Sequence, residues 1–397
     1  MMHANALSGV KVLDLSTMMA GPFGAMMLAD LGAEVIKVET LEGDGTRAFQ
    51  PHFKDGDSLY YHSLNKNKKS LAIDLKSEKG IALFYELVKG ADVVWDNFRA
   101  GVKEKLKIDY DNVVKYNPKI ISCSITAFGT ANPYDDDQPS FDLCVQAMSG
   151  VLDMTGEPDR PPVKMGVPMG DLGSGWYGVV GVLAALVARE KTGKGQKVDV
   201  SMLDGLASLH TYEAAYYLNS GVVPSRIGTA HRSVVPYQIF PTKNIYIAIV
   251  GTIDKFWVSI CNVLGKPEWA TDERFKNLSG RFKNRDLVVS MMSEKLMERD
   301  CEEWVAEFRK VKVPCGPVNP MDKALNEPLL LARNMVVEVE RGGETIKLLG
   351  NPVKLSGNVD VYKAPPRLGE NTDEILSQMA GLGMEEIAAL RQESVIK

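Results

Sequence analysis

The chain has 397 residues, of which 45% are hydrophobic and 24% are charged. This length exceeds that of one ordinary core and predicts two or three domains, while the composition excludes a disordered or collagen-like chain. Forty-six Lys and Arg against 51 Asp and Glu give a net charge of −5. We therefore expect no nucleic-acid partner, and any bound anion must meet local positive charge.

The five cysteines are scattered and include no Cys-x-x-Cys pair, which favours a reducing compartment. The N-terminal segment MMHANALSG has no basic stretch followed by an apolar one, so it does not resemble a secretory signal. The longest apolar run, Tyr177–Ala188, is shorter than a bilayer span and is followed directly by Arg189–Lys191. We therefore expect a cytoplasmic protein without a membrane partner.

Strand and helix patterns alternate through the first 150 residues. The run Val10–Leu15, the helical pattern Ala25–Glu34 and the run Val35–Val38 form a strand–helix–strand unit, which implies parallel strands. The alternation continues with a helix at Lys79–Lys89, a strand at Asp92–Trp95, a helix at Tyr110–Tyr116 and a strand at Lys119–Ile125. These patterns predict an open α/β sheet whose ligands bind at the carboxyl ends of the strands.

The later elements predict a second, smaller domain. After Ser225 the pattern changes to short strands near Ile239 and at Ile245–Val250 followed by charged helices, and from Asn319 strand and helix signals return. The predicted division is a large α/β domain at 1–222, a small α+β domain at 223–325, and a C-terminal segment at 326–397 that returns to the large domain. The other expected elements are a long helix at Gly175–Glu190, a strand at Lys197–Val200, a helix at Met202–Asn219 and a helix at Met384–Gln392.

Several common catalytic motifs are absent from the sequence. There is no G-x-S-x-G, no H-E-x-x-H, no P-loop and no G-x-G-x-x-G after the first strand. None of the five histidines has the spacing of metal ligands. These absences weigh against a zinc hydrolase, a nucleotide kinase and a dinucleotide dehydrogenase, and we expect neither a metal site nor a tightly bound cofactor.

The segment Gly170–Gly175 places Asp171 between glycines just before the long apolar helix. An aspartate in this place is ordinarily an N-cap, which accepts hydrogen bonds from the first N–H groups of the helix. Alternatively it is a nucleophile, with free N–H groups at the helix start holding an oxyanion. Since the reference pKa of Asp is about 3.9, such a nucleophile is expected to be ionised and to need no general base.

A basic segment, Asn65–Ser70, precedes an expected strand at Leu71–Leu75 and then Lys76. Its lysines either form a solvated strand edge or provide a seat for a polyanion such as a phosphate-rich cofactor, and the pattern does not decide between the two. Arg47 lies in the turn Gly43–Arg47 and is a candidate anion clamp.

Further short segments follow in a fixed order along the chain. They are Leu13–Leu15, Ala20–Phe23, Leu28–Leu31, Gly32–Glu39, Asp96–Arg99, Phe128–Gly129, Gln146–Gly150, Gly170–Asp171, Lys191–Gln196, Val313–Val318, Gly369–Glu370 and Thr372–Leu376. Together they resemble the class III CoA-transferases, the family of formyl-CoA:oxalate, carnitine and succinyl-CoA:glutarate CoA-transferases. The resemblance covers nearly the whole chain, and the ordered set is highly specific.

The resemblance implies a Rossmann-like parallel sheet, a smaller α+β domain and a homodimer of two interlinked rings. It further implies that Asp171 attacks an acyl-CoA thioester and passes through an aspartyl-CoA thioester, so that CoA moves to a free carboxylic acid without a metal or redox cofactor. Met19, Arg47 and Phe141 are the candidate contacts to the acid. The expected contacts to CoA are Met18, Ala20, Ile73, Leu75, Lys76, Asn97, Phe98, Lys105 and Leu106.

Departures from the family pattern bear on the substrate. Met19 stands where the oxalate-specific enzymes carry a glutamine, and no run of four glycines occurs between Pro236 and Gly251. The segment Gly228–His231 instead resembles the glutarate-type members, which favours a dicarboxylate such as succinate or glutarate.

Two other functions stay open. One is an α-methylacyl-CoA racemase, although Phe141 occupies the position of the racemase histidine and cannot accept a proton. The other is a non-catalytic CoA-binding protein of the same fold.

Overall fold

The computed structural model describes residues 5–130 and 139–397, which form two compact units, here called the large unit and the small unit. The predicted boundaries after residues 222 and 325 differ by one and two residues from the observed breaks after residues 221 and 327. Residues 152–163, predicted to belong to the large domain, instead group with the small unit. The large unit comprises the described residues of Met1–Val151, Lys164–Gly221 and Pro328–Lys397, and the small unit comprises Leu152–Val163 and Val222–Glu327.

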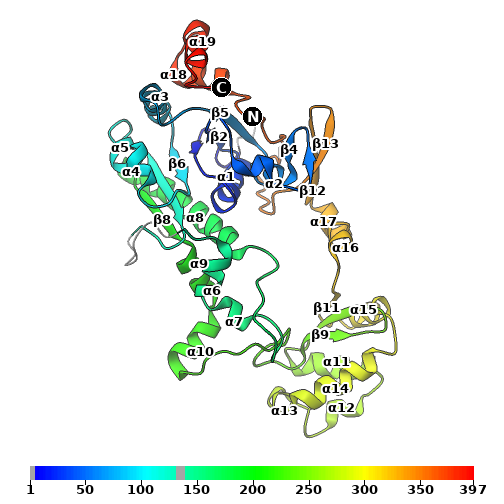
Figure 1. The fold of residues 1–397 in the computed structure, drawn as a ribbon. Coiled ribbons are helices and arrows are strands. Elements are labelled where there is room, and N and C mark those ends of the chain that lie inside the picture. Colours follow the sequence, from blue (N-terminus) through cyan, green and yellow to red (C-terminus); the bar gives the residue numbers. More distant parts are fainter. Residues whose placement is uncertain (1–4, 131–138) are drawn as a thin grey trace. The chain divides into compact units, whose positions relative to one another are not determined.

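The centre of the large unit is a six-stranded sheet in which every neighbouring pair of strands is parallel (Figure 1). The α/β class and the parallel sheet predicted from the sequence are therefore confirmed. In order across the sheet, the strands are β5 (Lys68–Ala72), β2 (Glu34–Glu39), β1 (Lys11–Asp14), β6 (Val93–Asp96), β7 (Ile121–Thr126) and β8 (Lys197–Ser201).

The strand order reverses between β1 and β6. From β1 the chain builds outward through β2 and β5, and it then returns to the other side of β1 to add β6, β7 and β8. In open parallel sheets the loops at the carboxyl ends of the two strands at such a reversal diverge and leave a crevice, where ligands usually bind. A ligand site is therefore expected at the loops that follow Asp14 and Asp96.

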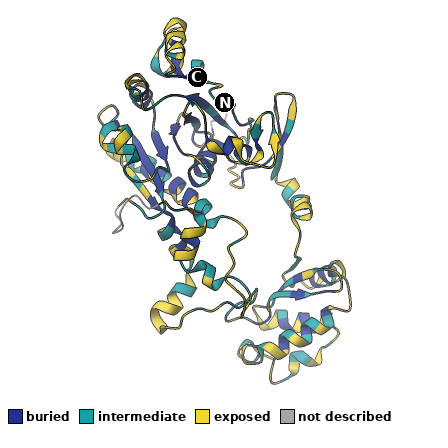
Figure 2. Cartoon of the chain, in the orientation of Figure 1, coloured by how far each residue is buried: buried dark blue, intermediate teal, exposed yellow. Residues whose placement is uncertain are grey.

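Alternate side chains of the strands face two separate hydrophobic cores, because successive residues of a β-strand point to opposite faces. Val12, Val93 and Trp95 belong to one core, and Leu13 and Val94 belong to the other. Both faces of the strands are buried (Figure 2), as is usual for a parallel sheet covered by helices on each side.

Two helices, α1 (Ala20–Asp30) and α8 (Met169–Thr192), pack closely together on the Trp95 face of the sheet. Glycine permits this approach: a Cβ at Gly24 would lie 2.5 Å from the Trp95 ring and 2.8 Å from the Gly175 carbonyl oxygen. The predicted start of the long helix near Gly175 is wrong, because α8 begins at Met169. Asp171 is consequently part of the first helical turn.

By length and composition alone, α8 is the one helix of the described residues that could cross a membrane. It packs against α1, β7, β8 and α9 (Met202–Leu209). The single helix predicted at Met202–Asn219 is also wrong, because α10 (Tyr212–Ser220) begins a separate helix. The break occurs at Thr211, whose φ of 45° is incompatible with a continuous right-handed helix.

The C-terminal segment packs against the second face of the sheet. Ile375, Leu376 and Ile387 belong to the same core as Leu13, and Ile396 forms an antiparallel bridge with Ile73 just beyond β5. The helices on this side include α3 (Glu78–Lys89), α18 (Thr372–Ala380) and α19 (Met384–Gln392). The remaining elements of the large unit are η1 (Gly45–Ala48), β3 (Phe53–Lys54), β4 (Asp57–Ser58), α2 (Leu59–Asn65), α4 (Val102–Leu106), α5 (Tyr110–Val113), α6 (Asp142–Met148), α17 (Pro328–Ala332), β12 (Val336–Arg341) and β13 (Glu344–Leu349).

The small unit has its own hydrophobic core beneath a three-stranded antiparallel sheet, with Trp257 and Trp304 fully buried in it. The chain passes from the large to the small unit within α7 (Val151–Met154). The strands and helices of the small unit are β11 (Cys315–Pro317), β10 (Tyr246–Val250), β9 (Tyr237–Pro241), α11 (Asp254–Val263), α12 (Glu268–Thr271), α13 (Leu278–Lys283), α14 (Arg285–Leu296), α15 (Cys301–Lys310) and α16 (Met321–Leu325).

Candidate functional site

A cavity of about 510 Å³ opens in the large unit at the carboxyl ends of β1 and β6, where the strand order reverses. Its wall consists of the loop Thr17–Ala20, the loop Asn97–Ala100, the end of β7 and the first turn of α8. Among the described lining residues, Asp171 is the only anion and Arg99 the only cation. The cavity therefore presents one carboxylate in a largely apolar wall.

Asp171 is half-buried, and no described residue donates a hydrogen bond to its carboxylate. The helix N-cap is Pro168, which has no capping side chain, so the interpretation of Asp171 as an N-cap is wrong. Burial raises the pKa of Asp171 to about 7, with a further contribution from the negative charge of Asp142. The expectation of an ordinary, fully ionised aspartate therefore does not hold, because this carboxyl keeps its proton to a higher pH than a solvated aspartate does.

Asp142, at the start of α6, occupies part of the α8 N-terminus. Its Oδ1 accepts the backbone N–H of Gly170 at 2.8 Å, and its Oδ2 accepts the side-chain N–H of Gln146 at 2.6 Å. The sequence pattern suggests that free N–H groups at the helix start hold an oxyanion. The Gly170 N–H cannot do so here, because it is already donated to Asp142.

The negative charges of Asp171 and Asp142 also act on Tyr60 of α2. Burial and the carboxylates of Asp171, Asp44 and Asp142 raise the pKa of Tyr60 to about 12, so the phenol is neutral and a potential hydrogen-bond donor. Tyr60, Asp142 and Gln146 were missed as site residues. Gln146 lies in a segment of the family resemblance, but no sequence periodicity relates positions 60, 142 and 171.

The structure brings together some of the predicted site residues and not others. Those in the cavity wall are Asp171, Met18, Met19, Ala20, Asn97, Phe98 and Phe141. Those outside it are Arg47, Ile73, Leu75, Lys76, Lys105 and Leu106.

Most of the predicted CoA contacts outside the cavity lie beside the second core of the sheet. Ile73 is 1% exposed, belongs to that core and donates its backbone N–H to the Glu39 carbonyl oxygen, so it is not available to a ligand in this structure. Leu75 and Leu106 pack against the same core from the surface. Lys76 and Lys105 are exposed, and within the described residues neither forms an ion pair, which leaves both available to a phosphate.

The basic segment Asn65–Ser70 is neither a solvated edge nor a polyanion seat. The strand begins at Lys68 rather than Leu71, and the Lys68 ammonium is fully buried at 2.8 Å from the Asp14 carboxylate. Lys66 pairs with Asp30 in the same buried way. The positive charges of these lysines are therefore neutralised inside the large unit.

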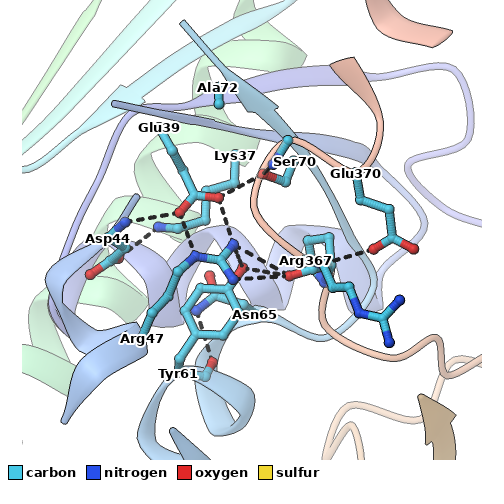
Figure 3. A network of polar contacts seen from close by, with 12 residues as sticks. Lys37, Glu39, Asp44, Arg47, Tyr61, Asn65, Ser70, Ala72, Arg367 and Glu370 are labelled. Atoms are coloured by element: carbon cyan, nitrogen blue, oxygen red, sulfur yellow. Dashed lines mark hydrogen bonds and ion pairs between the residues drawn. The ribbon is translucent and has the colours of Figure 1, made fainter. Parts of the chain in front are cut away.

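Arg47 is likewise committed to the protein interior rather than to an anionic substrate (Figure 3). Its guanidinium is held by Glu39 at 2.7 Å, by Asp57 at 2.8 Å and by the Tyr61 hydroxyl at 2.6 Å. Asp57 also accepts a hydrogen bond from Arg341, which ties the C-terminal segment to the same network. The prediction of Arg47 as an acid contact is corrected to a structural role.

Nothing in the described residues forms a group of three or more His, Cys, Asp or Glu side chains placed to hold a metal ion. The chemistry that the cavity itself offers is that of a poorly solvated carboxylate, which can act as a nucleophile or as a proton acceptor.

Comparisons with known proteins place this geometry in context. Residues 7–372 match the profile of the family described as CoA-transferase family III. The chain is 37% identical over 382 residues to a succinate–glutarate CoA-transferase of Agrobacterium fabrum, covering 94% of this chain and 95% of that protein. It is 37% identical over 376 residues to an acetyl-CoA:oxalate CoA-transferase of Acetobacter aceti, with 94% and 95% covered.

A human succinyl-CoA:glutarate CoA-transferase is 35% identical over 399 residues, covering 100% of this chain and 91% of that protein. Among solved structures, a CAIB/BAIF family protein from Brucella suis superposes with a TM-score of 0.85 at 36% identity. That match covers 94% of this chain and 99% of the other. The similarity thus extends through both units.

Proposed function

The chain belongs to CoA-transferase family III, and from this premise we propose that Asp171 is the nucleophile that carries CoA from an acyl-CoA thioester to a free carboxylate. The observation that supports this role is the position of the Asp171 carboxylate in the cavity wall. Asp171 is the only carboxylate among the described lining residues of the cavity, and no described side chain or backbone group is hydrogen-bonded to it.

The proposed reaction proceeds through two anhydrides and one thioester. The Asp171 carboxylate attacks the thioester carbonyl of the donor, which forms a mixed anhydride and releases CoA thiolate. The thiolate attacks the aspartyl carbonyl, which gives aspartyl-CoA thioester and free donor acid. The acceptor carboxylate then attacks that thioester to form a second anhydride, whose acceptor carbonyl is attacked by the thiolate. The product is a new acyl-CoA, and Asp171 is regenerated.

The environment of Asp171 favours this chemistry. A carboxylate that receives no hydrogen bond and little solvation is a stronger nucleophile than one in water, because less stabilisation is lost when it attacks. The same environment raises its pKa to about 7, so its basicity exceeds that of an ordinary aspartate. The apolar wall, which includes Met18, Met19 and Met202, limits the access of water that would hydrolyse an anhydride.

We infer that the acceptor is a small dicarboxylic acid. Relatives that cover 94–100% of the chain carry names that include succinate or succinyl, glutarate, oxalate and mesaconate, all of them derived from dicarboxylic acids. Arg99 supplies the positive charge at the cavity wall that an anionic substrate needs. Exposed Lys76 and Lys105 supply further positive charge for the phosphates of CoA.

A homodimer is the second part of the proposal. The buried share of the most apolar stretch of α8 is 39%, and Trp176, Val180 and Val187 on it are exposed. Helix α10 adds exposed Tyr216 and Leu218. Because soluble monomers rarely expose apolar side chains in such number, a second copy of the chain is the proposed cover. Size-exclusion chromatography with light scattering tests this, and a monomer of 43.6 kDa would contradict it.

Trapping of the intermediate tests the nucleophile directly. Incubation with an acyl-CoA and hydroxylamine, followed by peptide mass spectrometry, is expected to convert Asp171 to a hydroxamate. Asp171→Ala is expected to abolish acyl exchange while CoA binding persists. An active enzyme in which Asp171 stays unmodified would exclude the mechanism.

Two other experiments test the alternatives, a racemase and a non-catalytic CoA-binding protein. Incubation in deuterium oxide that labels the α-carbon of a 2-methylacyl-CoA without carboxylate exchange would identify a racemase. Binding of CoA without exchange or deuteration, tested with succinyl-, glutaryl- and acetyl-CoA against a panel of acids, would identify a non-catalytic protein.

A further inference from the structure

The side chain of Gln146 bridges α6 and the loop before α8 through both ends of its amide. Its Nε2–H donates to Asp142 Oδ2 at 2.6 Å, and its Oε1 accepts the backbone N–H of Met165 at 3.1 Å. Asp142 Oδ1 in turn accepts the N–H of Gly170, the residue before Asp171. Gln146 is fully buried and does not line the cavity, so it acts on the site only through Asp142.

We propose that Gln146 is a positioning residue that fixes the Asp142 carboxylate against the start of α8, so that the nucleophile operates beside a second, immobile negative charge. This inference rests on the proposed function of Asp171. It assigns a role to Gln146, which the transferase mechanism does not use.

A glutamine suits this position because the bridge needs a donor at one end and an acceptor at the other. Asp142 Oδ2 requires an N–H, and the Met165 N–H requires an oxygen. Glutamate at position 146 would supply only acceptors and would place two carboxylates together, while leucine would leave both partners unpaired in the interior. Only a side-chain amide satisfies both partners without adding charge.

The fixed charge of Asp142 affects Asp171 in two ways. It repels the ionised form of Asp171, and it takes the N–H of Gly170, which would otherwise contribute to the positive end of the α8 dipole. Both effects destabilise the Asp171 anion. Formation of the anhydride or thioester removes the charge on Asp171 and relieves the repulsion, so the covalent intermediates are favoured relative to the free carboxylate.

Other groups facing Asp171 contribute less or stay constant. Tyr60 of α2 is neutral throughout the relevant pH range, because its pKa is raised to about 12. Arg99, in the loop after β6, is the only cationic residue among the described residues that line the cavity. The other elements that line the cavity, represented by Ala20 of α1, Thr126 of β7 and Met202 of α9, present no titratable side chain there. Burial is the larger cause of the raised pKa of Asp171, and Asp142 is the neighbouring charge that raises it further.

A charge-exchange variant tests the proposal while preserving the hydrogen bonds. In the double variant Asp142→Asn/Gln146→Glu, the Asn Oδ1 accepts the Gly170 N–H, the Asn Nδ2–H donates to the new carboxylate, and that carboxylate accepts the Met165 N–H. The negative charge moves one side chain farther from Asp171. Gln146→Leu is the companion variant, which removes the bridge altogether.

The first measurement does not depend on activity. A carboxyl group whose pKa is raised by folding stabilises the protein most below its unfolded pKa of about 3.9, and this contribution is lost as the pH rises through about 7. The melting temperature of Asp171→Asn relative to its parent should thus rise from about pH 4 and level off near pH 7, the folded pKa of Asp171. In the charge-exchange background, we expect this levelling-off to occur about one pH unit lower, because the like charge is farther away.

The second measurement is the split between kcat and KM. Since Gln146 does not touch the cavity, Gln146→Leu should lower kcat about tenfold and change the KM for acyl-CoA by less than twofold. The charge-exchange variant should melt within a few degrees of wild type and show the acid limb of its pH–rate profile shifted by the same pH unit as the levelling-off of the stability difference.

Two outcomes would overturn the proposal: a levelling-off at an unchanged pH in a correctly folded charge-exchange variant, or wild-type kcat in Gln146→Leu. The melting measurements use no substrate, so absence of CoA transfer in the wild-type protein would reject the proposed function while leaving the inference on charge placement to be decided by the pH at which the stability difference levels off.

Discussion

Asn97 holds the main chain of Thr17 through both ends of its side-chain amide. The Thr17 N–H donates to Asn97 Oδ1 at 2.9 Å, and Asn97 Nδ2–H donates to the Thr17 carbonyl oxygen at 2.8 Å. This pair joins the loops after β1 and β6 across the point where the strand order reverses. Because both ends of the amide are used, the side chain of Asn97 shapes the cavity rather than offering a free contact to CoA.

Replacement of Asn97 should therefore weaken substrate binding through the loop. Met18, which follows Thr17 in the chain, has a φ of 68°, a conformation that costs a non-glycine residue roughly 1 kcal/mol. Without the amide pair in Asn97→Ala, Met18 is expected to relax, and the KM for acyl-CoA should rise about tenfold. The added change Met18→Gly removes the cost of positive φ and should recover part of the loss. Steady-state kinetics of the two variants measure this, and an additive loss would contradict it.

The raised pKa of Asp171 predicts an acid limb in the activity of the free enzyme. The carboxylate must be ionised to attack, and its pKa is raised to about 7, so the ionised fraction declines as the pH falls below neutrality. We expect kcat/KM to be roughly thirtyfold lower at pH 5.5 than at pH 8. A profile that stays level down to pH 5 would indicate an ordinary aspartate. Circular dichroism across the same range controls for unfolding.

Two lysines close together in the sequence should respond oppositely to the same substitution. Lys68 is buried and paired with Asp14, so Lys68→Met leaves Asp14 buried without its counter-ion and should cost about 3–5 kcal/mol of unfolding free energy. Lys76 is exposed, and Lys76→Met should change stability by less than about 0.5 kcal/mol. Its effect should instead be a higher KM for CoA. Denaturant unfolding and kinetics on both variants test the distinction.

The buried lysines Lys66 and Lys68 illustrate how far the sequence could predict the structure. The apolar runs and helical patterns located the strands of the sheet and hence its parallel form, because continuous apolar runs reflect burial on both faces. The sequence did not show that Lys66 and Lys68 pair with Asp30 and Asp14, since ion pairing depends on contacts between strands and helices far apart in the chain. A lysine-rich segment looks the same whether its partners are phosphates or buried carboxylates.

The candidate site was predictable to a similar extent. Glycines around position 171 marked a helix start near a ligand, and the ordered motifs indicated the loops at Met18 and Asn97. The start of α8 was placed too late because Met169–Gly175 contains three glycines, which disfavour helix in isolation but permit close packing on α1. The relation of Asp171 to Asp142 and Tyr60 is purely tertiary, so no local pattern could reveal its raised pKa.

Arg99 is the only cation among the described lining residues of the cavity, and its removal should affect binding more than chemistry. Arg99→Gln keeps a polar side chain but removes the charge, so the KM of the anionic substrate that meets it should rise about tenfold. If that substrate is the acceptor acid, monocarboxylates should be less affected than dicarboxylates. Kinetics with matched pairs of mono- and dicarboxylic acids measure the effect, and an unchanged KM for every substrate would remove Arg99 from the site.

The packing of α1 against α8 predicts that one added methyl group damages the site from a distance. A Cβ at Gly24 would meet both the Trp95 ring and the Gly175 carbonyl oxygen at distances that atoms do not adopt, and neither the backbone nor a buried indole can move freely. Gly24→Ala should therefore cost about 1–3 kcal/mol of stability and lower the exchange rate, because α8 carries Asp171.

Gly45→Ala is the matched control for that substitution. A Cβ at Gly45 meets nothing within 4 Å, and the residue lies in the same unit at an exposed position. Gly45→Ala should have the melting temperature and the activity of the wild-type protein. Equal melting temperatures for Gly24→Ala and Gly45→Ala would show that the α1–α8 contact tolerates a side chain, and that the start of α8 is positioned by other contacts.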